Sequence, residues 1–165
     1  MTMRLPVAGT VARGQADYMD PYPNTSEGYE QAGKELVNPV PNTPENLAEG
    51  KILFNTYCWQ CHGHTGGADG PVMASGKFPK PSPWVTYQSE YIKNLPEGKM
   101  YQTITYGKNL MGSHAPMLDP TQRWKIIHYI KYLSTLPPSK GTPVAGNAKD
   151  STKTAAVADT TKKAN

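Results

Sequence analysis

The two cysteines of this chain lie three residues apart, and a histidine directly follows the second, in the stretch YCWQCHG. If this stretch is helical, Cys58, Cys61 and His62 are related as i, i+3 and i+4 and share one helix face. Two thiols beside one imidazole can hold a flat ring, through two thioether bonds and one nitrogen ligand to a central iron. The stretch therefore predicts one covalently attached c-type haem, with His62 as an iron ligand.

Three other uses of this cluster fit the sequence less well. A structural zinc site needs four ligands, and although His62 or His64 could join the cysteines, no second pair lies at the usual spacing. A redox-active thiol pair of the thioredoxin type belongs in a setting of alternating strands and helices, whereas the preceding residues have a helical pattern. A disulfide between positions three apart on a helix has poor geometry and leaves the histidine unexplained.

The composition allows only part of the 165 residues to pack into a core. Apolar residues make up 37% of the chain, which also contains 16 prolines and 15 glycines, so burial cannot offset the entropy of ordering every segment. Residues 1–43 lack a sustained period but include Tyr18, Tyr22 and Tyr29. We interpret them as an extended arm that docks on a surface, its own or a partner's. Residues 137–165 are small, polar and free of aromatic residues, which predicts a disordered tail.

Helical patterns are confined to residues 44–136. Thr43 can cap the first helix and Pro44 suits its first turn, and this helix is expected to end at the cysteines. The last helix is expected to begin after Asp119, which forms a capping box with Gln122. Shorter helices are expected over residues 89–95 and 97–106. The pattern predicts an all-α domain of four to five short helices, for which an apolar haem would supply the core.

A second iron ligand is expected from a methionine, because Met/His ligation raises the reduction potential of a c-type haem. Met111 lies in the loop YGKNLMGSHAPML between two predicted helices. Gly107 and Gly112 beside it would let the backbone approach a flat ring. Met111 is therefore the first candidate for the sixth iron ligand. Met117 and His114 in the same loop remain alternatives, as does an open iron site.

Charge and hydropathy exclude several classes of function. Residues 44–136 carry nine basic and six acidic side chains, a balance of +3, which is too weak and scattered for a nucleic-acid interface. The sequence has no run of 18 apolar residues, so no membrane-spanning helix is predicted. The start MTMRLPVAGTVARG lacks the apolar core of a secretory signal. Because haem attachment of this kind requires export with reduced thiols, we expect that an upstream leader is missing from this chain.

Together these motifs resemble those of the class I cytochrome c family. In that family a glycine and an aromatic residue of the first helix cross the last helix near an aromatic residue, which implies this role for Gly50, Phe54 and Tyr129. A closer resemblance covers residues 4–136 and includes the arm. The segments similar to the monohaem cytochrome c subunit, or E subunit, of bacterial alternative complex III are PVAGTVARGQ, YPNTSEGYEQAGKEL, NPVPNTPENLAEGKILFNTYCWQCHG, GKFPKPSPW and NLPEGKMYQTITYGKNLMGSHAPML.

The resemblance implies single-electron transfer through one covalent haem c within a quinol-oxidising respiratory complex. The implied partners are a pentahaem cytochrome subunit and, beyond the complex, a terminal oxidase or its cytochrome domain. The implied location is the periplasmic side of the bacterial inner membrane, with a lipid anchor that is not in this chain. We expect no catalysis by the chain on its own. The alternatives are a free periplasmic electron carrier, a zinc-binding interaction module and a small peroxidase with an open iron site.

Overall fold

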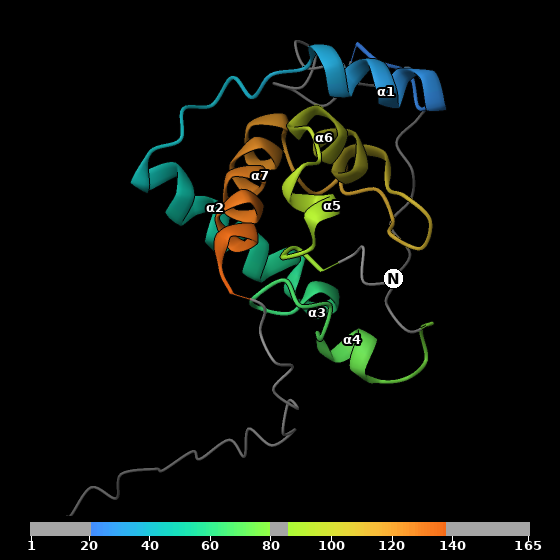
Figure 1. Cartoon of the computed structure of the whole chain (residues 1–165), viewed down its shortest axis with the longest axis vertical. Coiled ribbons are helices and arrows are strands. Elements are labelled where there is room, and N and C mark those ends of the chain that lie inside the picture. Colours follow the sequence, from blue (N-terminus) through green and yellow to red (C-terminus); the bar gives the residue numbers. More distant parts are fainter. Residues whose placement is uncertain (1–20, 80–85, 138–165) are drawn as a thin grey trace, which may run out of the picture.

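The computed structural model describes residues 21–79 and 86–137 of the chain (Figure 1). Within these ranges the chain forms helices and no β-strand, apart from one isolated bridge between Lys108 and Met111. The helices are α1 (Ser26–Glu35), α2 (Pro44–Tyr57), α3 (Trp59–His62), α4 (Pro71–Ala74), α5 (Glu90–Lys93), α6 (Glu97–Tyr106) and α7 (Pro120–Thr135). The predicted all-α class is confirmed.

The domain of residues 44–136 contains six helices in its described part, α2 to α7, where four to five were predicted. Two of them, α3 and α4, are single turns of four residues that were not predicted as separate helices. A single turn is too short to produce a helical hydrophobic period, so the sequence pattern could not separate these turns from loops. The longer helices α2, α6 and α7 lie where the sequence predicts them.

Side-chain caps fix the starts of the two longest helices. The Thr43 hydroxyl accepts a hydrogen bond from the Asn46 amide at 3.2 Å, before Pro44 in the first turn of α2. Before α7, Asp119 Oδ1 accepts from the Gln122 amide at 2.8 Å, and Gln122 Oε1 accepts from the Asp119 amide at 3.0 Å. These caps satisfy amides that would otherwise lack partners, and both were predicted.

The helices α2 and α7 cross in direct contact, as Figure 1 shows. At the crossing, a Cβ on Gly50 would lie 2.1 Å from the Lys125 carbonyl oxygen, so only glycine allows this approach. One turn further, the Phe54 ring is completely buried and meets the Tyr129 ring edge to face, with centroids 5.3 Å apart. The predicted roles of Gly50, Phe54 and Tyr129 in the crossing are confirmed.

The apolar core lies between this crossing and α6. Its largest fully buried side chains are Phe54, Leu118, Ile126, Ile127 and Leu133. The stacked rings of Tyr101 and Trp124 join α6 to α7, with centroids 4.3 Å apart. Burial of this apolar surface holds the two longest helices together and supplies the main stabilisation. None of the helices in the described ranges is long and apolar enough to cross a bilayer.

Part of the predicted extended arm is helical, and this corrects the prediction for residues 26–35. Helix α1 packs against α6 (Figure 1), and a Cβ on Gly98 would lie 2.0 Å from the Ala32 carbonyl oxygen. Lys99 of α6 also forms an ion pair with Glu30 at 2.7 Å. The buried residues of SEGYEQAGKE are the small Gly28 and Ala32, so the segment lacks the large apolar side chains that would have indicated a packed helix.

Residues 36–43 continue the contact of the arm with the domain. The Asn38 side-chain amide donates to the Trp124 carbonyl at 3.4 Å, and His128 Nε2 lies 2.7 Å from the Val40 carbonyl oxygen. The described part of the arm therefore lies on the surface of this chain itself. Residues 1–20 and 138–165, which include Tyr18 and most of the predicted tail, lie outside the described residues. The domain boundaries stay a prediction.

Replacing Gly50 tests the helix crossing. Gly50→Ala would push a methyl group into the Lys125 carbonyl, and we expect a loss of about 1–3 kcal/mol in the free energy of unfolding, as for other overpacked contacts. Urea unfolding followed by circular dichroism measures the loss. The matched control is Gly112→Ala, because a Cβ there meets nothing within 4 Å. Equal stability of the two variants would contradict the assignment.

Candidate functional site

Three of the four predicted haem-binding residues, Cys58, Cys61 and His62, lie in one helical turn. Helix α2 ends at Tyr57, and Cys58 then caps the short helix α3. The Cys58 carbonyl accepts from the amides of Cys61 at 3.2 Å and His62 at 3.0 Å. Both cysteines are free thiols, with Cys58 partly buried and Cys61 exposed. The turn therefore presents two thiols and an imidazole together, as the i, i+3, i+4 spacing predicts.

Gly63 ends this turn in a backbone conformation that other residues rarely adopt. Its φ is 74°, and a Cβ there would lie 1.8 Å from Asp69 Oδ1. The Gly63 amide donates to the Trp59 carbonyl at 2.8 Å, which closes α3. Glycine at this position thus lets the chain leave α3 immediately after His62 and return close to it.

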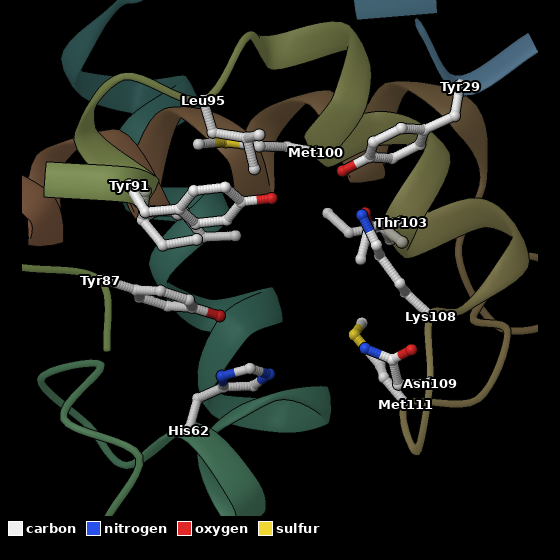
Figure 2. Close-up of a pocket in the computed structure, with 13 residues that line it drawn as sticks. Tyr29, His62, Tyr87, Tyr91, Leu95, Met100, Thr103, Lys108, Asn109 and Met111 are labelled. Carbon is white, nitrogen blue, oxygen red and sulfur yellow. The ribbon is translucent and has the colours of Figure 1, made fainter. Parts of the chain in front are cut away.

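A cavity of about 450 Å³ opens beside His62. Its walls come from α1, α3, α5, α6, α7 and the loop after α6, with Tyr87 from the segment before α5. Figure 2 shows His62 and Met111 on opposite sides of this space. The volume lies within the usual range of pockets for small molecules and cofactors. His62 and Met111, the predicted nitrogen and sulfur ligands, are far apart in the sequence but line the same cavity.

Hydrogen bonds hold the Met111 loop against α6. The amide and carbonyl of Lys108 pair with the carbonyl and amide of Met111, each at 3.0 Å. Gly107 begins this turn with a φ of 83°, and a Cβ on it would lie 2.4 Å from the Met111 carbonyl oxygen. Further along, the Ser113 hydroxyl donates to the Thr105 carbonyl at 2.6 Å. These bonds fix the backbone from which the Met111 side chain reaches the cavity.

The other two sequence candidates for the sixth ligand lie elsewhere. Met117 is 45% exposed, and neither Met117 nor His114 lines the cavity. The His114 ring nitrogen Nδ1 lies 3.0 Å from the Gly112 carbonyl oxygen within its own loop. Of the three candidates, Met111 is the one placed opposite His62.

Arg123 anchors the second half of the same loop and was missed by sequence reasoning. Its side chain is 5% exposed, and Nε and Nη2 donate to the Leu118 carbonyl at 3.1 and 3.0 Å. Nη2 also donates to the Ala115 carbonyl at 3.4 Å, and Nη1 donates to the Thr105 hydroxyl at 3.1 Å. A buried guanidinium with these acceptors ties the loop to both α6 and α7. Nothing in the sequence around Arg123, a basic residue near the start of α7, indicated that its side chain would be buried and would bind the loop.

The environment of His62 suits an iron ligand. Burial lowers the pKa of His62 to about 4, with a smaller contribution from His114, so the imidazole is neutral at pH 7. A neutral imidazole offers a nitrogen lone pair to a metal. The Tyr87 ring stacks on the imidazole, with centroids 5.0 Å apart and planes inclined by 22°. Tyr87 therefore orients the ring, and the loop sequence before α5 gave no sign of this.

Burial also affects the groups beside His62. It raises the pKa of the Cys58 thiol to about 12, with a smaller contribution from Cys61, and it raises the pKa of Tyr87 well above its usual value. Both groups therefore stay protonated at neutral pH.

The zinc interpretation lacks a ligand set in the described residues. His64 stacks on Trp59 with centroids 4.6 Å apart, and its Nδ1 lies 3.0 Å from Asn55 Oδ1. Within residues 21–79 and 86–137, no group of three or more His, Cys, Asp or Glu side chains could hold a metal ion. The geometry therefore favours a planar cofactor between His62 and Met111 over a tetrahedral zinc ion.

Comparisons with known proteins identify the family of this chain. Residues 45–130, more than half of the chain, match the family described as cytochrome C oxidase, cbb3-type, subunit III. The chain belongs to this family. It is a family of cytochrome c domains, which implies a covalent haem c and haem-mediated electron transfer. Helix α1 lies before the matched residues.

The chain is also similar to a solved structure. A chain of the reducing HAO-like protein complex of Kuenenia stuttgartiensis is 28% identical, with a TM-score of 0.49. The alignment covers 58% of this chain and 46% of that one, so this cytochrome c domain spans less than half of the other chain's length. Comparison with curated protein sequences gave no significant match.

Proposed function

We propose that this chain transfers single electrons through one covalent haem c. In this proposal Cys58 and Cys61 form the thioether bonds, and His62 and Met111 are the two iron ligands. The observation that carries the proposal is the placement of His62 and Met111 on opposite sides of one cavity (Figure 2). When bound, haem supplies an iron that changes its charge by one electron without making or breaking bonds to a substrate.

The surrounding residues have separate roles in this function. Tyr87 stacks on the imidazole and so fixes its plane. The Met111 thioether favours ferrous iron, which raises the reduction potential. Apolar side chains of the cavity wall, including Ile104 and Ile130, exclude water from the iron. With both axial positions filled by protein ligands, small molecules would be kept from the iron, which suits electron transfer rather than peroxidase chemistry.

Replacing a cysteine tests haem attachment. Cys58→Ser removes one of the two sulfurs, so we expect that little stable holoprotein is formed and that the domain loses the packing of the ring against its cavity wall. The control is Gln60→Ala, because the Gln60 side chain donates only to the Thr56 carbonyl within the helix. Denaturing mass spectrometry and the pyridine haemochrome spectrum measure bound haem. A wild-type chain with only its polypeptide mass would refute the proposal.

A pair of methionine variants tests the sixth ligand. Met111→Ala should keep the haem attached but lower the midpoint potential by on the order of 0.1 V or more, since axial ligands set haem potentials over about 0.8 V. It should also let cyanide bind the iron. Met117→Ala should leave both properties unchanged, because Met117 does not line the cavity. Redox titration and cyanide difference spectra measure these effects, and the reverse pattern would assign the ligand to Met117.

We propose further that the chain is the monohaem subunit of alternative complex III, on the periplasmic side of the bacterial inner membrane. Two observations support this. The resemblance to that subunit extends through the arm, beyond the residues shared by cytochrome c domains in general. The family matched by residues 45–130 is described as cytochrome C oxidase, cbb3-type, subunit III, which supports a place in a redox complex of several subunits but does not single out alternative complex III. In the proposed complex the chain exchanges electrons with a pentahaem cytochrome subunit and a terminal oxidase, and the complex and a lipid anchor hold it at the membrane.

Copurification tests the proposed complex. The tagged chain is expressed from its own chromosomal locus and extracted from membranes with a mild detergent. We expect it to elute with a multihaem cytochrome and with quinol-oxidising activity. Elution as a monomer would favour the free electron carrier, and elution with the catalytic subunit of a terminal oxidase alone would make it an oxidase subunit. Either of these outcomes would overturn the assignment to alternative complex III while leaving the haem site intact.

A further inference from the structure

Helix α1 contributes to the cavity although it lies before the residues that match the cytochrome c family. The Tyr29 side chain of α1 is part of the cavity wall. Lys108 comes from the start of the Met111 loop, and its Nζ lies 3.8 Å from the centroid of the Tyr29 ring. Figure 2 shows the Tyr29 hydroxyl group and the Lys108 ammonium group close together at the edge of the space. Two segments far apart in the sequence thus place two hydrogen-bond donors at one end of the cavity.

Lys108 differs from the neighbouring lysines in its partners. Lys99 is paired with Glu30 at 2.7 Å, and Lys125 is paired with Glu49. Within the part of the chain that the structure describes, Lys108 has no carboxylate within ion-pair distance, and its one recorded interaction with a carboxylate is the weaker, longer-range attraction to Glu30, which is already paired with Lys99. The cavity wall itself contains no Asp or Glu side chain. An ammonium group at the cavity therefore remains available to an anion that the cavity would hold.

The chemistry of haem supplies such an anion. Its two vinyl groups lie on one side of the ring, and its two propionate carboxylates lie on the other. Cys58 and Cys61 share the turn of His62 and would hold the vinyl side there. Figure 2 places Tyr29 and the Lys108 ammonium group at the end of the cavity away from His62. A carboxylate drawn into a protein needs charged or hydrogen-bonding partners, and these two side chains are suitably placed.

We propose that Tyr29 and Lys108 form the binding site for the propionate carboxylates of the haem. This inference rests on the proposed function, because it presumes a haem between His62 and Met111. The Tyr29 hydroxyl donates a hydrogen bond and Lys108 provides a positive charge. Helix α1 is then part of the cofactor pocket, and the ion pair between Lys99 and Glu30 and the close contact of Ala32 with Gly98 hold it in place.

Two variants of the full-length holoprotein test this site. Tyr29→Phe removes the hydroxyl donor and keeps the ring, and Lys108→Met removes the charge at similar length. The matched controls are Tyr132→Phe, on an exposed tyrosine of α7, and Lys93→Met, which breaks a surface ion pair with Glu90. Haem labelled with ¹³C at its propionate carboxyls is introduced through a labelled biosynthetic precursor. Redox-induced infrared difference spectra then report these carboxyl groups directly.

We expect both site variants to shift the labelled carboxylate bands and both controls to leave them unchanged. Lys108→Met should also lower the midpoint potential, because loss of a nearby cation favours the ferric state. Lys108→Arg keeps the positive charge and should restore the potential. Labelled bands that are the same in wild type, Tyr29→Phe and Lys108→Met would overturn the proposal. So would a Lys108→Arg potential equal to that of Lys108→Met.

The design separates this inference from the proposed function. If the wild-type chain carries no haem, the proposed function fails first. If it carries haem and Met111→Ala opens the iron, but the labelled bands do not respond to the Tyr29 and Lys108 variants, only the propionate site is refuted. Should Tyr29→Phe lower the yield of holoprotein, the spectra of the loaded fraction, normalised to its haem content, still decide the question.

Discussion

The close contact of α2 with α7 is the constraint on which the rest of the structure depends. A side chain at position 50 would collide with the Lys125 carbonyl, so the two helices could not approach this closely. Because they do, Phe54 can contact both Tyr129 and Tyr87, with ring centroids 5.3 and 5.9 Å apart. Helix α3 follows α2 directly, and the Met111 loop leads into α7. The crossing therefore sets how far apart the walls that carry His62 and Met111 can lie.

Features encoded within a few residues could be predicted from the sequence. The caps at Thr43 and Asp119 depend on one polar side chain and the next turn, and the turn of Cys58, Cys61 and His62 depends only on helical geometry. The partners of Gly50 and Phe54 are distant in sequence, and they could be named only through the resemblance to a family in which this crossing recurs.

Features created by contacts between distant segments could not be predicted in the same way. Helix α1 buries only the small residues Gly28 and Ala32, so its position depends on the close contact of Ala32 with Gly98 of α6. From the sequence, an arginine near the start of a helix would be expected on the surface. Arg123 is instead buried and donates to the backbone carbonyls of Ala115 and Leu118 in the preceding loop. Tyr87 follows a proline-rich stretch, and it can orient the imidazole only because the fold brings His62 beside it. The partners of α1 and Tyr87 are distant in the sequence. Arg123 is close in sequence to Ala115 and Leu118, but it contacts their backbone carbonyls, which no side-chain pattern reveals.

The two proposed iron ligands therefore depend on the fold to different degrees. His62 is placed by one local turn that any helix of this sequence would form, and the adjacent cysteines would keep it near the iron even if distant contacts loosened. Met111 is placed by hydrogen bonds between its loop and α6, and by the hydrogen bonds of Arg123 to the Leu118 carbonyl later in the same loop. Loosening of those contacts would release the thioether first, because no covalent bond retains it. The reduction potential of the domain is thus tied to the packing of α6 and α7, and the buried Arg123 guanidinium links that packing to the loop.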